Sequence, residues 1–426
     1  MSKSPSTKNT GIRGQKEPLS ASLVEEIITR KGHDRPVWVR LWRKTLQRIL
    51  PLGGHSSGNS VRLFHDGDAA FSEMLTAIDH AQHRVWLETY IFEDDLLGQK
   101  VRAALWRAKN RGVDVRILFD SFGSNGLPSD FFDVLLDAGA KVVAFNPLFP
   151  FVFRRASQGR KPNAWTTRDH RKLLVVDDDR AFLGGMNISC DYAGPKFGNG
   201  SFRDTHLEVK GPAVIDVANL VLTSMKQTVR EEQVHQEHDV VQEHSVGTVV
   251  QLLSSNARRG RQQIQRSLRQ CVTRSLETCY LTSPYFVPPR RLLWAMSFAA
   301  RRGVDVRVLT AGRSDVPISK WAGQAVYARL LKKGVRIFEL QSATLHAKTA
   351  SVDGIYSLVG SFNLDSWSYR RNLEVSLGIV EPKIAAELEE QFLEDLKGAR
   401  EIKLEEVRSH SWHHKARSWV SYQLLR

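Results

Sequence analysis

Two short segments of the chain carry the same reactive residue types at the same spacing. In each, a Lys follows a His by two residues, an Asp by seven, a Gly by fourteen and an Asn by seventeen. The two sets are His170, Lys172, Asp177, Gly184 and Asn187, and His346, Lys348, Asp353, Gly360 and Asn363. Two sets of residues with identical spacing are not plausibly due to chance. Both segments are therefore candidate reactive sites.

A His, a Lys and an Asn on one face suit the binding and transfer of a phosphate group. Lys and Asn can bind phosphate oxygens and stabilise the charge that builds in the transition state. A His whose pKa is near neutral can attack phosphorus or protonate a leaving oxygen. Two facing sets would supply one nucleophile and one general acid. Because two lysines balance the anionic charge, we predict neither a metal ion nor another cofactor.

The apolar residues on either side of Asp177-Asp178-Asp179 predict a β-hairpin, with the His and Lys of the motif on one face. A hairpin centred between residues 178 and 179 places Asn187 opposite His170. The same arithmetic places Asn363 opposite His346. Since opposed positions lie about 4.5–5.5 Å apart, each Asn could share a phosphate oxygen with its His and Lys.

The aspartates of the two motifs are predicted to act structurally. Seven extended residues span roughly 23 Å, at about 3.3 Å each, so an Asp at that position lies far from the His. We therefore expect Asp177 and Asp353 to organise the turns, unless the strands bend sharply. The motifs still include both aspartates among the candidate catalytic residues.

Each reactive His also needs a hydrogen-bond acceptor that orients its second ring nitrogen. A further parallel between the halves aligns residues 204–209, DTHLEV, with residues 370–375, RRNLEV. From these stretches we favour Asp204 and Glu374 as the acceptors. Two residues from equivalent earlier strands are predicted to line the cleft, Glu88 and Tyr285. A packing or surface role is the open alternative for all four.

The elements that position these residues alternate between strands and helices, and their order occurs twice. The first half is predicted to have strands at 61–64, 85–92 and 113–119 and helices at 68–80 and 97–111. In the second half, residues 279–286 match the strand at 85–92, and residues 301–309 match 110–118 closely. The pattern predicts an α/β fold of two tandem domains related by a pseudo-twofold axis. Each domain would contain a mixed, mostly parallel sheet flanked by helices, and the active site would lie at the seam.

The predicted domains span residues 59–230 and 249–400, joined by a polar linker at 231–248. Residues 1–58 combine a tail expected to be disordered with a basic amphipathic helix, and residues 401–426 form a basic segment that contains Trp. The linker has three histidines, but no Cys or well-spaced carboxylate completes a metal site. These are His235, His238 and His244.

Two basic segments near the ends of the chain, at 35–50 and 412–426, place Trp and aliphatic residues at helical spacing. Such a helix can lie in a membrane interface. Alternatively, the first could pack its apolar stripe on the body of the protein, and the second could cover a sheet edge. The sequence leaves both alternatives open.

The composition indicates a globular protein with an anionic partner. The 426 residues carry a net charge of +15, which attracts either nucleic acid or anionic lipid. The three cysteines, Cys190, Cys271 and Cys279, have no metal or disulfide spacing. No apolar stretch is long enough to predict a transmembrane helix, and no secretory signal is recognised.

Both motifs resemble the signature of the phospholipase D superfamily, H-x-K-x(4)-D followed by G-x-x-N. Several longer stretches are similar to bacterial cardiolipin synthases, in particular the short type that lacks N-terminal transmembrane helices. These include ETYIFEDD (88–95), HRKLLVVDDDRAFLGGMNIS (170–189) and GSFNLDSWSYRRNLEVS (360–376). The likeness covers roughly residues 60–400.

The resemblance implies that phosphatidylglycerol is the anionic substrate and that a phosphatidyl group is transferred through a phosphatidyl-histidine intermediate. Cardiolipin and glycerol would be the products, with His170 favoured as the nucleophile. It also implies a peripheral location on the cytoplasmic face of the bacterial inner membrane. The main alternative is a phosphodiesterase that hydrolyses another phospholipid or nucleic acid, although nucleic acid is not the expected partner. A catalytically inactive lipid-binding scaffold is less favoured because both His-Lys pairs are intact. The acceptor alcohol and the oligomeric state remain open.

Overall fold

The computed structural model describes residues 21–30, 36–147, 155–156, 167–228, 247–256, 261–314 and 316–425. The tail at 1–20 and all but the last two residues of the linker predicted at 231–248 lie outside these ranges. The three linker histidines therefore lie outside the described residues as well.

The first half contains the predicted alternation of strands and helices. Its elements are β1 (Gly54–Phe64), α3 (Gly67–His80), β2 (Arg84–Thr89), α4 (Leu96–Asn110), β3 (Asp114–Asp120), α5 (Asp133–Asp137), β4 (Lys141–Phe145), β5 (Leu173–Val176), β6 (Arg180–Gly184), β7 (Phe202–Arg203), β8 (His206–Lys210) and α6 (Ala213–Thr228). Local residues fix the helix ends. The carboxylate of Asp66 accepts hydrogen bonds from two backbone N–H groups at the start of α3, and Gly112, with φ of 90°, follows the end of α4.

The second half repeats this order. Its elements are β9 (Thr248–Asn256), β10 (Arg261–Gln262), α7 (Gln263–Arg274), β11 (Thr278–Thr282), α8 (Arg290–Arg301), β12 (Asp305–Ala311), α9 (Pro317–Leu331), β13 (Arg336–Leu340), β14 (Thr344–Leu345), β15 (Thr349–Val352), β16 (Tyr356–Gly360), α10 (Ser366–Arg370), β17 (Leu373–Val380), α11 (Pro382–Lys397) and β18 (Ala399–Ile402). Helices α1 (Ala21–Arg30) and α2 (Pro36–Ile49) precede the first half, and α12 (Leu404–Ser409) and α13 (Trp412–Leu425) follow the second.

The two halves share one continuous sheet. The first half contributes the strand order β4-β3-β2-β5-β6-β8-β1, and the second continues it as β9-β17-β16-β15-β11-β12-β13-β18. Apart from β18 at the edge of the second half, each half thus has the same internal order, and the two meet where β1 pairs antiparallel with β9. This junction gives the arrangement the pseudo-twofold relation that the duplication predicts.

The sheet is mixed, as expected, but the prediction that it is mostly parallel is wrong. Among the described strands of the large sheet, parallel pairing is confined to β2-β3-β4 and β11-β12-β13. The motif hairpins and the strands beside them pair antiparallel. Short hairpin connections can join only antiparallel neighbours, whereas parallel neighbours need a longer crossover.

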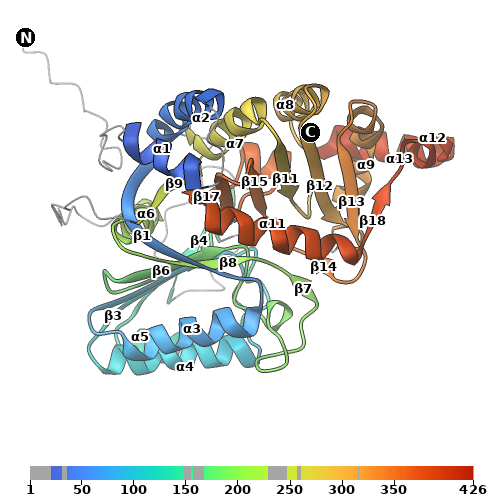
Figure 1. Cartoon of the computed structure of the whole chain (residues 1–426). Helices are drawn as coiled ribbons and strands as arrows, with labels where there is room; N and C mark the ends of the chain where they lie inside the picture. The colour runs from blue at the N-terminus through green and yellow to red at the C-terminus, as the bar shows by residue number, and fades with distance from the viewer. Residues whose placement is uncertain are drawn as a thin grey trace, which may run out of the picture.

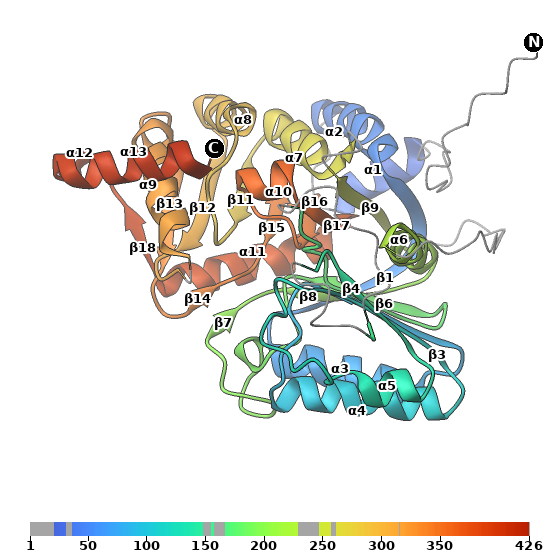
Figure 2. The same cartoon turned by 180° about the vertical axis from the view of Figure 1, so that it is seen from behind.

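The helices form layers on both faces of the sheet (Figures 1 and 2). Helices α3, α4 and α5 cover the outer face of the first half, and α1, α2, α7, α8 and α9 cover that of the second. Helices α6 and α11 pack on the inner faces, where apolar side chains of both halves form one cluster. The halves are therefore joined by a shared core as well as by the sheet.

The apolar stripe of the helix predicted at 35–50 packs on the body of the protein and is not free to enter a membrane. Trp38, Trp42 and Leu46 of α2 are buried against the second half. The indole Nε1 of Trp42 donates a hydrogen bond to Asp353 Oδ2 at 3.0 Å. The packing alternative is therefore the correct one for this stripe.

Candidate active site

The backbone of the opposite half holds each motif histidine. His170 N donates to Leu373 O at 3.0 Å, and His346 N donates to Arg203 O at 2.8 Å. These two contacts are related by the pseudo-twofold axis. They bring a histidine from one half beside the residue that follows in the other, which is Glu374 in one case and Asp204 in the other.

The two carboxylates accept hydrogen bonds from the histidines across the seam. His170 Nδ1 lies 3.1 Å from Glu374 Oε2, and His346 Nδ1 lies 2.7 Å from Asp204 Oδ2. Lys348 Nζ also lies 2.9 Å from His346 Nδ1. A ring nitrogen that carries hydrogen cannot accept a bond, so we assign the hydrogen of Nδ1 to the shorter contact with Asp204. In both rings this leaves Nε2 without a hydrogen and able to react, and Tyr192 Oη lies 3.5 Å from that of His346.

Burial sets the charges of this cluster. It lowers the pKa of His170 below its ordinary value and lowers the pKa of His346 to about 4, so both rings are neutral at pH 7. Burial alone would raise the pKa values of Glu374 and Asp204. The adjacent histidines and lysines outweigh burial, so the pKa of each carboxyl lies below its usual range. Two neutral rings thus rest on two ionised carboxylates.

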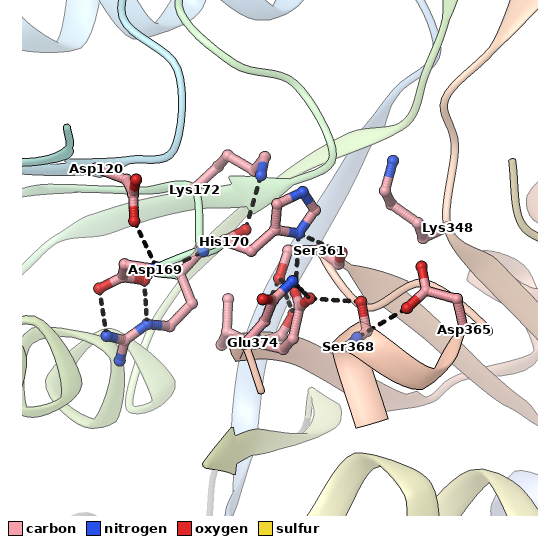
Figure 3. A network of polar contacts seen from close by, with 12 residues as sticks. Asp120, Asp169, His170, Lys172, Lys348, Ser361, Asp365, Ser368 and Glu374 are labelled. Atoms are coloured by element: carbon pink, nitrogen blue, oxygen red, sulfur yellow. Dashed lines mark hydrogen bonds and ion pairs between the residues drawn. The ribbon is translucent and has the colours of Figure 1, made fainter. Parts of the chain in front are cut away.

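A network of hydroxyl groups fixes Glu374 (Figure 3). Its Oε2 accepts from Ser361 Oγ at 2.5 Å, and its Oε1 accepts from Ser368 Oγ at 2.7 Å. Asp365 caps α10 by accepting from Ser368 N at 2.8 Å. Because burial raises the pKa of Asp365 to about 7, this carboxyl is partly protonated at neutral pH.

The predicted pairing of each His with an Asn in the hairpin is wrong by one residue. Leu173 pairs with Leu183 and Val176 with Arg180, so the hairpin is centred on Asp178 and its turn has three residues. In the second half Thr349 pairs with Val359, which gives the same geometry. The asparagines nevertheless reach the site, because the chain leaves the strand after the glycine and carries the Asn inward.

Both asparagines line the same pocket as the histidines. Asn187 accepts from Ile91 N at 3.1 Å and donates to Tyr192 Oη at 2.6 Å. Asn363 Oδ1 is buried and has no hydrogen-bond partner among the described residues. The amide of Asn363 is therefore the one whose oxygen is left for a ligand.

The motif glycines permit close packing between strands at the seam. A Cβ atom on Gly184 would lie 2.6 Å from His206 Cα, and one on Gly360 would lie 2.3 Å from Val375 O. No side chain fits at these distances. Glycine at these positions is what allows the acceptor strand, and with it the carboxylate, to approach the motif.

Each motif aspartate organises the start of a neighbouring strand. Asp177 accepts hydrogen bonds from the backbone N–H groups of Gln82, His83 and Arg84. Asp353 accepts from Leu276, Glu277 and Thr278 N in the same way. Both aspartates have positive φ, 51° and 56°, which Asp tolerates better than most residues. Neither aspartate lines the pocket.

We expect Asp177→Asn and Asp353→Asn to affect stability rather than turnover. An Asn keeps one acceptor oxygen but loses the charge, so buried Asp353 should lose about 2–3 kcal/mol of unfolding free energy and half-exposed Asp177 less. Urea unfolding measures the first effect, and turnover at a temperature where both variants are folded measures the second. Abolished turnover in a folded Asp177→Asn protein would instead give this aspartate a catalytic role.

The histidines and asparagines line a cavity of about 580 Å³ at the seam. Tyr285 also lines it, as predicted from its strand. Lys172 and Lys348 are buried just behind the wall, and the Nζ of each donates to the backbone oxygen of the histidine in its motif. Figure 3 shows the ammonium groups of Lys172 and Lys348 on either side of the His170 ring.

The prediction that Glu88 lines the cleft is wrong. Glu88 is fully buried beneath the site, where its Oε1 lies 2.7 Å from Arg171 Nε. Arg171 also binds Asp169, so one arginine neutralises a buried acidic pair. Burial raises the pKa of Glu88 well above its ordinary value, against the pull of Arg171. These contacts give Glu88 a structural role in holding the segment that precedes the motif.

Three aromatic residues of the wall that lie beside the histidine rings were not predicted. The ring of Tyr90 lies 4.9 Å from that of His170, and Tyr192 and Phe202 lie 5.1 and 5.6 Å from His346. Tyr90 follows the carboxyl end of β2, an edge where α/β sheets place their sites, so its position was a usable signal. Tyr192 ends a short 3₁₀ helix and Phe202 begins the two-residue β7, in a stretch whose path the sequence does not reveal.

Within the described ranges, no group of His, Cys, Asp and Glu is arranged to hold a metal ion. The titratable groups at the seam are instead committed to one another, as His–carboxylate pairs and Lys–carbonyl contacts. The arrangement can therefore use two neutral imidazoles, two ammonium groups and two amides for chemistry on a phosphate.

The fold resembles that of a solved lipid-modifying enzyme. The crystal structure of phosphatidylserine synthase from Haemophilus influenzae Rd KW20 superimposes with a TM-score of 0.65, at 14% identity, over 90% of this chain and 99% of that one. At this identity the likeness concerns the fold alone.

Comparison of sequences defines the family. Residues 74–201 and 268–396 both match the phospholipase D-like domain of cardiolipin synthase. Cardiolipin synthase A of Pseudomonas entomophila is 32% identical over 385 residues, 90% of this chain and 77% of the relative. Cardiolipin synthase 1 of Bacillus cereus is 30% identical over 403 residues, 91% of this chain and 75% of the relative. The chain belongs to the cardiolipin synthase family of proteins with two phospholipase D-like domains.

Proposed function

We propose that this protein is a phosphatidyltransferase that makes cardiolipin from two molecules of phosphatidylglycerol and releases glycerol. The observation that carries the proposal is the pair of buried histidines on one pocket, each oriented by a carboxylate from the other half. A phosphodiester between two such rings meets a nucleophile on one side and a proton donor on the other.

In the first step, His170 Nε2 attacks the phosphorus of phosphatidylglycerol, and a P–N bond forms as the bond to the glycerol oxygen breaks. The leaving oxygen takes a proton from Nε2 of His346. In the second step, the terminal hydroxyl of another phosphatidylglycerol gives its proton back to His346 and attacks phosphorus. The P–N bond breaks, which releases cardiolipin and restores His170.

The surrounding residues support both steps. A bound phosphodiester anion raises the pKa values of the neighbouring histidines, so the general acid gains its proton when substrate binds. The ammonium groups of Lys172 and Lys348 and the amides of Asn187 and Asn363 balance the charge that develops on the phosphate oxygens. Asp204 and Glu374 hold the two rings in orientation and stabilise the imidazolium form.

The reaction takes place at a membrane surface, where the protein meets its lipid substrate. No helix in the described part of the chain is long and apolar enough to cross a bilayer. We propose peripheral binding at the cytoplasmic face of the bacterial inner membrane, where phosphatidylglycerol would be reached from the surface.

Purified protein incubated with phosphatidylglycerol vesicles should release cardiolipin and glycerol in equal amounts, as measured by lipid mass spectrometry and a glycerol assay. Expression in a strain without cardiolipin should restore the lipid. Phosphatidic acid as the product would indicate a hydrolase instead, and cleavage of single-stranded DNA without lipid turnover would indicate a nuclease. A mixed product with added ethanolamine lipid or free alcohol would identify another acceptor.

A further inference from the structure

Helix α13 packs against the protein through its small polar residues and exposes its large apolar ones. It lies along α9, and its buried side chains are Ser418 and Ser421. On the solvent side, four apolar residues are 49–70% exposed. They are Trp412, Trp419, Val420 and Leu424, and we call them the α13 stripe. This helix covers another helix and not a sheet edge, and its stripe contributes little to the core.

An exposed row of this kind marks an interaction surface, because leaving Trp and Leu in water gains nothing for folding. Helix α2 provides the contrast within the same chain. It has a similar pattern of Trp and aliphatic residues, yet it buries Trp38 and Trp42. The exposure of its Trp side chains thus distinguishes α13 from α2, the other basic segment near the ends of the chain.

The α13 stripe ends at the mouth of the active-site pocket. Leu425, the next residue after the stripe, lines the pocket together with Val316 and Trp367. Val316 and Trp367 are themselves 38% and 40% exposed. Figure 2 shows the C-terminal end of α13 pointing toward the centre of the molecule, where α10 lies. An apolar surface therefore runs from the helix to the site.

Three exposed arginines lie in or beside the connections that supply residues to the pocket wall, and we call them the arginine rim. Arg290 and Arg291 begin α8, and Arg313 follows β12. Arg290 and Arg291 directly follow the connection that supplies Tyr285 to the pocket wall, and Arg313 lies in the connection that supplies Val316. Cations in the first turn of a helix oppose its dipole, so folding does not account for the pair on α8.

Two helices that line the pocket, α9 and α13, belong to a layer of helices without acidic residues. Helices α2, α7, α8, α9 and α13 each contact the next and contain no Asp or Glu, although all carry Arg or Lys. Carboxylates return in α1 and α12 at the two ends of the layer (Figure 1). Burial, followed by the neighbouring charges of Arg48 and Arg269, lowers the pKa of Arg274. Positive charge is thus crowded across this layer.

We propose that this face docks on an anionic lipid bilayer, with the α13 stripe in the membrane interface and the arginine rim against the headgroup phosphates. The pocket mouth then opens toward the lipid. The inference builds on the proposed function, because a lipid substrate must reach the pocket from the membrane. Basic residues alone would also suit nucleic acid, but Trp and Leu side chains that lead into the pocket favour a bilayer interface.

Binding to vesicles of phosphatidylcholine with and without phosphatidylglycerol tests the proposal. The full chain carries His170→Ala, so that lipid is not consumed during cosedimentation. Neutralising Arg290, Arg291 and Arg313 to Gln should lower the partition coefficient on phosphatidylglycerol vesicles by roughly fivefold per charge, on the order of 100-fold in total at low salt. Replacing Trp412, Trp419 and Leu424 by Ser should remove the binding that persists at high salt, where charge is screened.

In a matched control, three lysines outside the proposed docking face are changed to Gln, namely Lys100 and Lys109 of α4 and Lys141 of β4. This control should bind vesicles as its parent does. Equal binding by the arginine variant and its parent would overturn the proposal. The proposal would also be overturned if the arginine variant lost binding to single-stranded DNA but still bound vesicles as its parent does. Binding is measured without turnover, so the two proposals can fail separately. If the chain with His170 intact made no cardiolipin while the His170→Ala chain bound vesicles as expected, the proposed function would be contradicted and the docking face would stand.

Discussion

Replacement of His170 by Ala should lower phosphatidyl transfer by more than about 10⁴-fold, because the nucleophile forms the covalent bond on which both steps depend. His346→Ala should cost about 10²–10⁴-fold, the range of general acid catalysis. Lipid turnover with phosphatidylglycerol vesicles measures both. Thermal unfolding shows whether the variants are folded, and His65→Gln, outside the pocket, provides the matched control.

A leaving group that needs no proton separates the two roles. With a phosphatidyl ester of p-nitrophenol, His346→Ala should recover release of the phenol, whereas His170→Ala should not. The shorter carboxylate contact of His346, 2.7 Å against 3.1 Å for His170, supports this assignment because it better stabilises an imidazolium. The opposite pattern of rescue would make His346 the nucleophile. Rescue of neither variant would contradict the division of roles altogether.

The sequence predicts the repeated motif, the order of the elements and their meeting at a seam, because these follow from local patterns and duplication. It does not predict which carboxylate serves which histidine. The similarity of Leu207-Glu208-Val209 to Leu373-Glu374-Val375 suggested an alignment of Glu208 with Glu374. The strand register instead makes Asp204 the equivalent of Glu374, since Gly184 pairs with His206 and Gly360 with Ser376.

An alignment of the two halves that is based on similar short sequences can therefore be wrong by several residues when the strands differ in register. Glu208 Oε1 lies 3.3 Å from Arg180 Nη1, and Glu208 does not line the pocket. The crossing of acceptors between halves is a tertiary property, which no periodicity within one half encodes. For the same reason the buried stripe of α2 and the exposed stripe of α13 could not be told apart from their similar sequence patterns.

The alkaline limb of the pH profile should report Lys172. Burial lowers the pKa of this lysine to about 7, so it is charged below that pH and neutral above it. Since a charged Lys172 attracts the phosphodiester, kcat/KM should fall as the pH rises through about 7. The histidine pKa values, which burial lowers, place loss of the nucleophile on the acid side, below about 6.5.

Lys172→Arg should move the alkaline limb to higher pH, because a guanidinium stays charged over the whole range, even where its bulk lowers the maximal rate. Lys172→Met should remove the limb and lower kcat/KM by about 10²–10³-fold, the cost of losing one group that stabilises developing charge. Lys109→Arg, on the surface of α4, is the control and should leave the profile unchanged. An alkaline limb that stays near pH 7 in Lys172→Arg would show that another group titrates there, and the partly protonated Asp365 on the pocket wall would then be the next residue to replace.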